Sequence, residues 1–134
     1  MNGYFVKIEK IDWIDKDGKE ASIRFSFKDQ IANAYSFPCN FLVGEIVEVY
    51  LVPLYEETSD ESFWKENIDG IKKIDQAEDH EWRYYCYGEI KGVNPYLLNC
   101  GVFEFEMAYN KTVDSSIIGK YVYFVIARLD IIEV

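Results

Sequence analysis

The sequence predicts a mainly β protein: a single small β-barrel-like domain of about six strands with one short helix. Apolar and polar residues alternate in several segments, as they do in strands with one buried face. The length of 134 residues suits one domain with a sizeable core and is too short for two. Hydrophobic residues make up 49% of the chain and aromatic residues 17%, which argues against disorder.

Two strands joined by a tight hairpin are expected in the first 28 residues. Apolar residues occupy every second position from Ala21 to Phe27. Between Tyr4 and Trp13 the alternation changes parity beside Glu9, which predicts a β-bulge there. The joining segment 15–18 contains an Asp-Gly step, which we expect to supply the positive φ of a tight turn.

A third strand is expected over residues 44–52, ending before Pro53, which lacks an N–H for further pairing. Thr58 and Glu61 have the spacing of a capping box, so a short helix is expected to begin there. Three apolar residues continue it at helical spacing: Trp64, Ile68 and Ile71.

Strand character returns after the helix. We expect a strand over residues 82–91, a second over 98–107 with a bulge beside Gly101, and a third over 121–132. The last strand is nearly all apolar and should be buried on both faces, with Arg128 and Asp130 sharing one of them.

The two halves resemble each other weakly. Three pairs of identical residues are separated by the same offset: Gly44 and Gly119, Val47 and Val122, Leu54 and Leu129. An internal repeat would explain them, and so would two meanders that obey the same pleat rules.

Three strands, a helix and three further strands around an apolar interior resemble an OB-like small β-barrel, although six strands exceed the five of that class. A β-sandwich and an SH3-like barrel are the alternatives. Residues 1–134 form one domain, in which segment 56–81 separates two three-stranded halves. The resemblance implies a barrel that stacks single-stranded nucleic acid or a saccharide on its aromatic residues.

Charge opposes the nucleic-acid interpretation. The chain has 14 basic and 24 acidic residues. The resulting net charge of −10 disfavours binding to phosphates or to anionic membrane surfaces. Segment 56–81 alone contains ten acidic residues and three lysines, a net charge of −7. A solvated helix and loop, or a docking surface for a basic protein, would explain this concentration.

Aromatic residues accompany these charges, and interfaces combine aromatic anchors with charges that steer association. Tyr85 and Tyr87 share one face of their strand with Arg83, while Trp82, Tyr84 and Cys86 share the other. The candidate partner-binding residues are Glu56, Glu57, Asp60, Glu61, Phe63, Trp64, Tyr85 and Tyr87.

Common catalytic motifs are absent from the sequence. His80 lies among Glu78, Asp79 and Glu81, and we interpret this run as a solvated loop; the alternative is a carboxylate–histidine enzyme site. No catalytic residue, metal site or cofactor is therefore expected. The three cysteines (Cys39, Cys86 and Cys100) lack a Cys-x-x-Cys spacing and are expected to be reduced, as in a cytoplasm.

These observations predict a cytoplasmic, non-enzymatic binding protein that docks a basic protein partner. Its composition is similar to that of bacterial immunity proteins and nucleic-acid mimics, which suggests an inhibitor or adaptor. No secretory signal or membrane-spanning run is visible in the sequence. Self-association through an exposed strand edge is compatible with this function.

Overall fold

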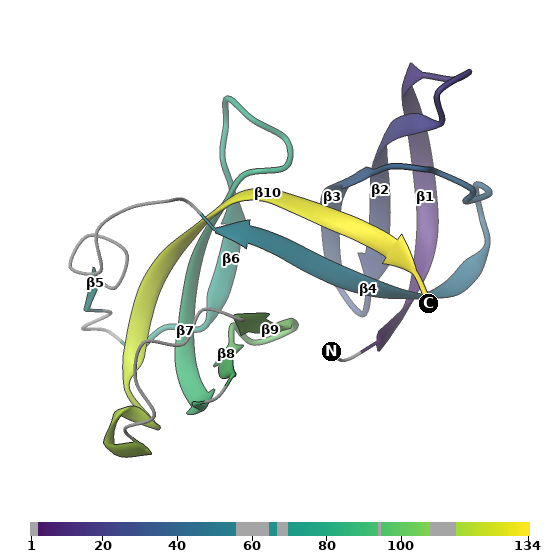
Figure 1. Ribbon diagram of the computed structural model, residues 1–134. Helices are drawn as coiled ribbons and strands as arrows, with labels where there is room; N and C mark the ends of the chain where they lie inside the picture. The colour runs from purple at the N-terminus through teal and green to yellow at the C-terminus, as the bar shows by residue number, and fades with distance from the viewer. Residues whose placement is uncertain (1–2, 56–64, 67–69, 94, 108–114) are drawn as a thin grey trace.

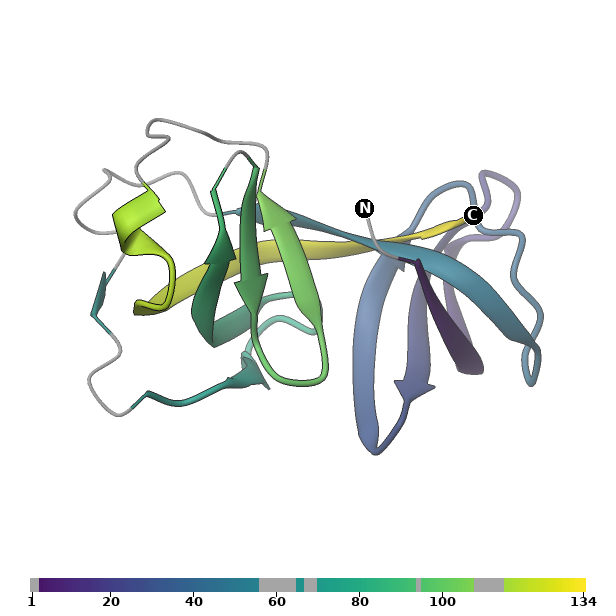
Figure 2. The same ribbon diagram turned by 90° about the horizontal axis from the view of Figure 1, so that it is seen from below.

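The computed structural model describes residues 3–55, 65–66, 70–93, 95–107 and 115–134. These residues form ten strands of one continuous sheet and one 3-10 helix, η1 (Ser115–Ile117), which confirms the mainly β class. The sheet is folded into two lobes, visible in Figure 1 and from below in Figure 2. No helix in these described ranges is long and apolar enough to cross a membrane.

The first lobe contains a three-stranded meander and the start of a long strand. Its strands are β1 (Gly3–Asp15), β2 (Glu20–Phe27), β3 (Gln30–Ser36) and β4 (Ile46–Tyr55). The second lobe contains β5 (Lys65–Glu66), β6 (Lys73–Gln76), β7 (Tyr84–Gly92), β8 (Tyr96–Asn99), β9 (Glu104–Met107) and part of β10 (Tyr121–Glu133).

Strands β4 and β10 run side by side across both lobes (Figures 1 and 2). Their antiparallel ladder extends from Arg128 opposite Leu54 to Glu133 opposite Val49. Beyond it, β10 pairs with β7 in the second lobe, while a parallel bridge joins its Asp130 to Tyr35 of β3. The strands β1, β2, β3, β10 and β4 therefore form a ring around the core of the first lobe.

The two halves of the chain have the same pairing pattern. In each, the first strand pairs with the second and fourth, and the second pairs with the third: β1 to β4 in one half and β7 to β10 in the other. A register shift follows Ile8 in β1 and Ile90 in β7, at equivalent points of the two ladders. The fourth strands begin at Ile46 and Tyr121, which have the same 75-residue offset as the repeated residues. This correspondence supports the internal repeat and confirms the bulge predicted beside Glu9.

A single hydrophobic cluster fills both lobes. Along β10 the buried positions change parity: Phe124 and Ile126 lie in the second lobe's part of the core, and Leu129 and Ile131 lie in that of the first. The opposite face of β10 is mostly half-buried, so the expectation of burial on both faces was too strong. The change of parity lets one strand contribute to both parts of the core.

One tyrosine of each half forms two hydrogen bonds with the backbone of a single residue in the other half, and we call each such pair of bonds a clasp. The Tyr4 hydroxyl of β1 donates to the Glu104 carbonyl (3.0 Å) and accepts from the Glu104 N–H (2.8 Å) on β9. The Tyr84 hydroxyl of β7 makes the same two bonds to Asn33 on β3, each 2.7 Å long. These bonds tie each meander to the third strand of the other.

The sequence analysis missed β3 altogether. Its Ala32 and Ala34 are buried opposite Phe25 and Ile23 of β2, where small side chains fit beside large ones. Alanine has a low propensity for strands, so packing against β2, rather than local propensity, determines that this segment forms a strand.

Two turns differ from expectation. The positive φ of the first hairpin belongs to Lys19 (57°), while Gly18 donates its N–H to the Asp15 carboxylate at 3.1 Å. The irregularity beside Gly101 (φ 94°) is a turn between β8 and β9, and its N–H is capped by the Asn99 side chain at 2.9 Å.

The predicted helix is not seen in the described part of segment 56–81. Its expected start at Thr58, and Trp64 and Ile68 of its apolar stripe, lie outside the described residues. Lys65–Glu66 instead pair with β10, and Lys73–Gln76 pair with β7. Tertiary context, here cross-strand pairing, thus outweighs the local helix signals in these two segments.

Replacing the buried Tyr84 with phenylalanine tests the clasp. We expect Tyr84→Phe to lower the free energy of unfolding by about 1–3 kcal/mol, because it leaves buried backbone groups of Asn33 without their partner. Tyr85→Phe, on the next residue and the opposite face, is the control and should change it by less than about 0.5 kcal/mol. Equal effects of the two variants in urea denaturation would contradict this role.

Alkaline pH should destabilise the protein. Burial raises the pKa of Tyr84 and of Tyr55, and it raises that of Tyr4 to a lesser degree. Unfolded tyrosines ionise near pH 10, about the ordinary pKa, while the folded ones keep their protons. The stability contributed by these groups is therefore present below about pH 10 and is lost as pH rises through their folded pKa values. Urea midpoints should fall between about pH 9.5 and 11.5, and less steeply for Tyr84→Phe; a flat profile would refute this linkage.

Candidate partner-binding site

Six of the eight candidate residues predicted from the sequence lie outside the described residues: Glu56, Glu57, Asp60, Glu61, Phe63 and Trp64. The other two, Tyr85 and Tyr87, lie on β7. The predicted division of faces is confirmed there, since Tyr84 and Cys86 are buried while Tyr85 and Tyr87 are half-buried on the outer side.

The chain's own cations occupy this outer tyrosine face. The Tyr87 ring lies 5.1 Å from that of Tyr123 on β10, and the Lys73 ammonium lies 5.1 Å from the Tyr87 ring centre. The Arg83 guanidinium lies 5.8 Å from the ring centre of Tyr85. Cation–π contacts of this kind already use the ring faces, which makes the pair a weaker candidate for a partner.

A more exposed acidic site lies at the turn between β6 and β7. Glu78, Asp79, His80 and Glu81 are all exposed there. Two backbone hydrogen bonds close the turn. The Ala77 N–H donates to the Arg83 carbonyl at 2.8 Å, and the Arg83 N–H donates to the His80 carbonyl at 3.1 Å. We call residues 77–83 the acidic turn.

The acidic turn is anchored to the first lobe through Ser22 of β2. The Ser22 hydroxyl accepts from the Trp82 indole N–H at 2.9 Å and donates to the Glu81 carboxylate at 3.0 Å. The Trp82 ring lies 5.1 Å from the Tyr35 ring and 5.4 Å from His80. A loop that would otherwise be free is thereby fixed against an aromatic surface.

Beside Tyr35 a hollow of about 260 Å³ opens where β3 meets β10. It is lined by Tyr35, Phe37, Arg128 and Asp130, together with two isoleucines of β10. Phe37 is 64% exposed. The acidic turn and this hollow share the Tyr35–Trp82 contact, and together they form what we call the acidic–aromatic site.

The arginine of this site is neutralised within the chain. Arg128 makes a two-bond pair with Asp130 at 2.7 and 3.1 Å, and its guanidinium lies 4.4 Å from the Tyr35 ring centre. The bond to Asp130 raises the pKa of Arg128. Its charge therefore orders the site without cancelling the carboxylates of the acidic turn.

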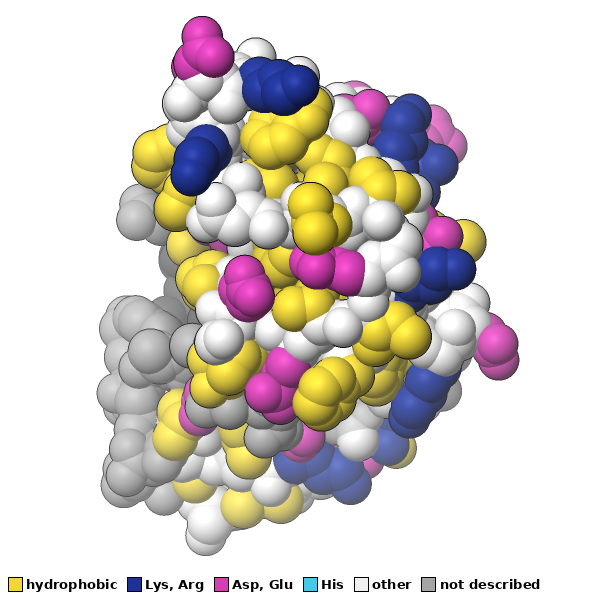
Figure 3. Space-filling model, turned by 90° about the vertical axis from the view of Figure 1, so that its right-hand side faces the viewer, with side chains coloured by type: hydrophobic (Ala, Val, Ile, Leu, Met, Phe, Trp, Pro, Cys, Tyr) yellow, Lys and Arg dark blue, Asp and Glu magenta, His cyan; other side chains and the backbone are white. Residues whose placement is uncertain are grey.

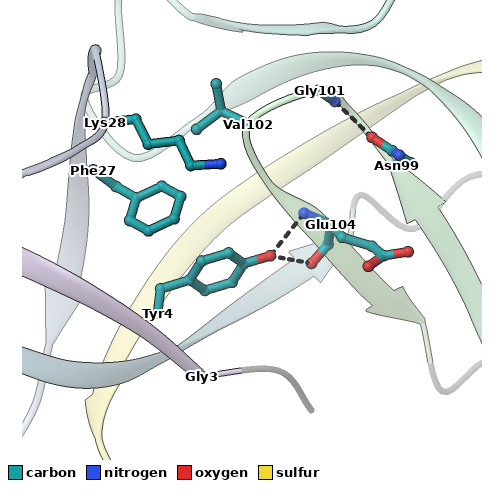
Figure 4. Close-up of a pocket in the computed structure, with 8 residues that line it drawn as sticks. All are labelled: Gly3, Tyr4, Phe27, Lys28, Asn99, Gly101, Val102 and Glu104. Carbon is teal, nitrogen blue, oxygen red and sulfur yellow. Dashed lines mark hydrogen bonds between the residues drawn. The ribbon is translucent and has the colours of Figure 1, made fainter.

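A second hollow of about 450 Å³ lies between the lobes (Figure 4). Figure 4 shows Tyr4, Phe27 and Lys28 of the first lobe facing Val102 and Glu104 of the second, with Tyr4 bonded to the Glu104 backbone. The Tyr4 ring, which lines this hollow, makes edge-on contacts with Phe27 (5.1 Å) and with Phe103 (5.5 Å). Among the described lining residues, Lys28 is the one cation.

The described residues include no group of three or more His, Cys, Asp or Glu side chains placed to hold a metal ion. The ring of His80 packs edge-on against the Trp82 ring, and its Nδ1 accepts a hydrogen bond from the backbone N–H of Trp82 at 3.3 Å. Cys86 and Cys100 are buried neighbours, and burial together with a bond to Cys100 raises the pKa of the Cys86 thiol.

The sequence analysis missed most of this site. Tyr35 and Phe37 lie in and after the unpredicted β3, and Trp82 was assigned to the face of Tyr84. The signal that could have located it was the pair Arg128 and Asp130, polar residues on one face of an otherwise apolar strand.

Comparison with protein-family models, with curated proteins and with solved structures gives no significant match.

Proposed function

We propose that this protein is a non-enzymatic, cytoplasmic binding protein that docks a basic protein partner on its acidic surface, as an immunity-like inhibitor or an adaptor does. One observation carries the proposal: the acidic turn, with its exposed carboxylates, packs through Trp82 against Tyr35, which lines a hollow together with the exposed Phe37.

Charge supports a basic partner. The chain has a net charge of −10, and segment 56–81, which includes most of the acidic turn, has −7. Nearby lysines are already paired: Lys72 and Lys91 with Glu89 at 3.1 and 3.3 Å, and Lys73 with Asp75 at 3.0 Å. These pairs leave the carboxylates of Glu78 and Asp79 without neutralising partners among the described residues.

Aromatic and arginine side chains of the site are suited to contribute binding energy at a protein interface. Trp, Tyr and Arg are enriched among the residues that dominate binding energies at protein interfaces. Here the Tyr35 ring contacts both Trp82 and Arg128, and the side chains of Trp82 and Arg128 are held by hydrogen bonds, so little side-chain freedom remains to be lost on binding. Exposed carboxylates around such anchors accelerate association with a basic surface.

We also propose that the first lobe is an OB-like barrel, because its ring of five strands matches the strand number of that class. The alternative function, a barrel for single-stranded nucleic acid or a saccharide, depends on this likeness. In OB barrels the outer face of the second and third strands binds such ligands. Here part of that face is covered: Ser22 bonds to Trp82 and Glu81, and the Asn33 side chain donates to Gln76 at 3.0 Å. The protein-directed function is therefore favoured.

Charge reversal at the acidic turn tests the proposed function. The probe is a fluorescently labelled arginine–serine repeat peptide, with a glutamate–serine peptide as the negative probe. We expect the first to bind at low salt and to be released at high salt. Glu78→Lys with Asp79→Lys should weaken its binding about tenfold or more, close to 1.4 kcal/mol. Reversal of Glu56, Glu57, Asp60 and Glu61 has the same expected effect.

The matched control is Asp17→Lys with Asp29→Lys, which makes the same charge change in two exposed hairpin turns of the first lobe. It should alter binding by less than about threefold, because screening limits distant charges. Equal losses in the control and in the acidic-turn variant would show attraction to net charge alone and would refute a docking site. A labelled single-stranded oligonucleotide should give no change in anisotropy at low salt; saturable binding would favour the alternative.

A further inference from the structure

The first lobe also has exposed apolar side chains on the outer side of β1 and β4. The first lobe's surface in Figure 3 shows hydrophobic side chains in several groups between single acidic and basic ones. On β1 and β4, Phe5 is 65% exposed and Ile46 is 73% exposed, and both project outward from the ladder. Exposed apolar groups continue on neighbouring segments: Leu42, Val43 and Ile132. We call these five residues the outer patch.

Register places Phe5, Ile46 and Ile132 of the outer patch on one surface. Phe5 lies opposite Glu48 and Lys7 lies opposite Ile46 in the β1–β4 ladder, and Ile132 lies opposite Tyr50 in the β4–β10 ladder. The inward positions of the same strands, such as Val6 and Val49, belong to the core. Exposed apolar side chains gathered on one face commonly mark an interaction site.

Two opposite charges flank Phe5. Lys7 is exposed on one side of it along β1. On the other side the carboxyl group of Glu48 lies over Gly3, 2.8 Å from the point that a Cβ of that residue would occupy. The two charges thus point away from each other, and neither forms an ion pair with another described residue. The order along the surface is carboxylate, aromatic ring, ammonium.

We propose that the outer patch binds a second copy of this chain in a two-fold symmetric dimer. A two-fold axis through Phe5 reverses the order of the three groups, so that Lys7 of each copy meets Glu48 of the other while the Phe5 rings meet at the centre. Two-fold interfaces require such self-complementary surfaces. Two like-charged chains of −10 repel each other elsewhere, and this charge-balanced, apolar face is where contact costs least.

The dimer is compatible with the proposed partner-binding function and does not rest on it. The acidic turn packs against Ser22 of β2, whereas the outer patch lies on β1, β4, the end of β10 and the loop before β4. The outer patch and the acidic–aromatic site share Ile132, which also lines the hollow beside Tyr35, whereas the acidic turn contains no residue of the outer patch. Each dimer would therefore present two copies of the acidic turn.

Sedimentation equilibrium of the full chain tests the dimer, at about 0.15 M salt to screen net repulsion and from about 5 to about 500 μM, because small interfaces associate weakly. The wild-type chain should form dimers within this range. Lys7→Glu and Glu48→Lys should each weaken association about tenfold or more, since each places like charges together twice. The double variant exchanges the two charges and should recover association to within about threefold of wild type.

A second pair of variants tests the apolar part. Ile46→Glu in the outer patch should abolish dimers, while Ile31→Glu, at a similarly exposed isoleucine of β3 (61%), should leave them intact. Circular dichroism checks that each variant is folded. A wild-type chain that stays monomeric throughout, a double variant no better than the single ones, or equal losses from Ile46→Glu and Ile31→Glu would each overturn the proposal.

Discussion

The antiparallel pairing of β4 with β10 is the interaction on which the other features of this fold depend. Each of these strands pairs with the first strand of its own half, β4 with β1 and β10 with β7. Their mutual ladder then joins the halves, and the end of β10 closes the ring against β3. Without that ladder each half would be a short meander with an unpaired edge and an incomplete core. Between Ile126 and Leu129 the buried side chains of β10 change from one face of the strand to the other, so this one strand contributes side chains to both parts of the core.

The acidic–aromatic site is a consequence of this arrangement. The acidic turn comes from the second lobe, Tyr35 and Phe37 come from the first, and Arg128 and Asp130 come from the shared strand. None of these groups would be neighbours if the lobes were apart. The clasps of Tyr4 and Tyr84, together with the bonds of Ser22, hold the lobes in the register that brings them together. Assembly of the acidic–aromatic site therefore depends on the contact between the lobes.

Local patterns predicted the elements that have strong periodicity. The strand ending at Phe27, the bulge beside Glu9 and the opposite faces of Tyr84 and Tyr85 all follow from the alternation of side chains, and the structure confirms them. Patterns that depend on distant partners were missed. Strand β3 has alanines because large residues of β2 cover them, and the Arg128–Asp130 pair acquires its role only when Tyr35 is brought beside it by the ring. The contact of Trp82 with Ser22, 60 residues away, has no local signature.

Native-state hydrogen exchange measures the central claim most directly, since it reports the opening free energy of each strand separately. If the β4–β10 ladder holds the two lobes as one unit, its amides should exchange slowest, with an opening free energy equal to the global free energy of unfolding, and both lobes should lose protection in one transition. Separate transitions for β1–β3 and β7–β9, with β4 and β10 exchanging no more slowly than the meanders, would contradict the account.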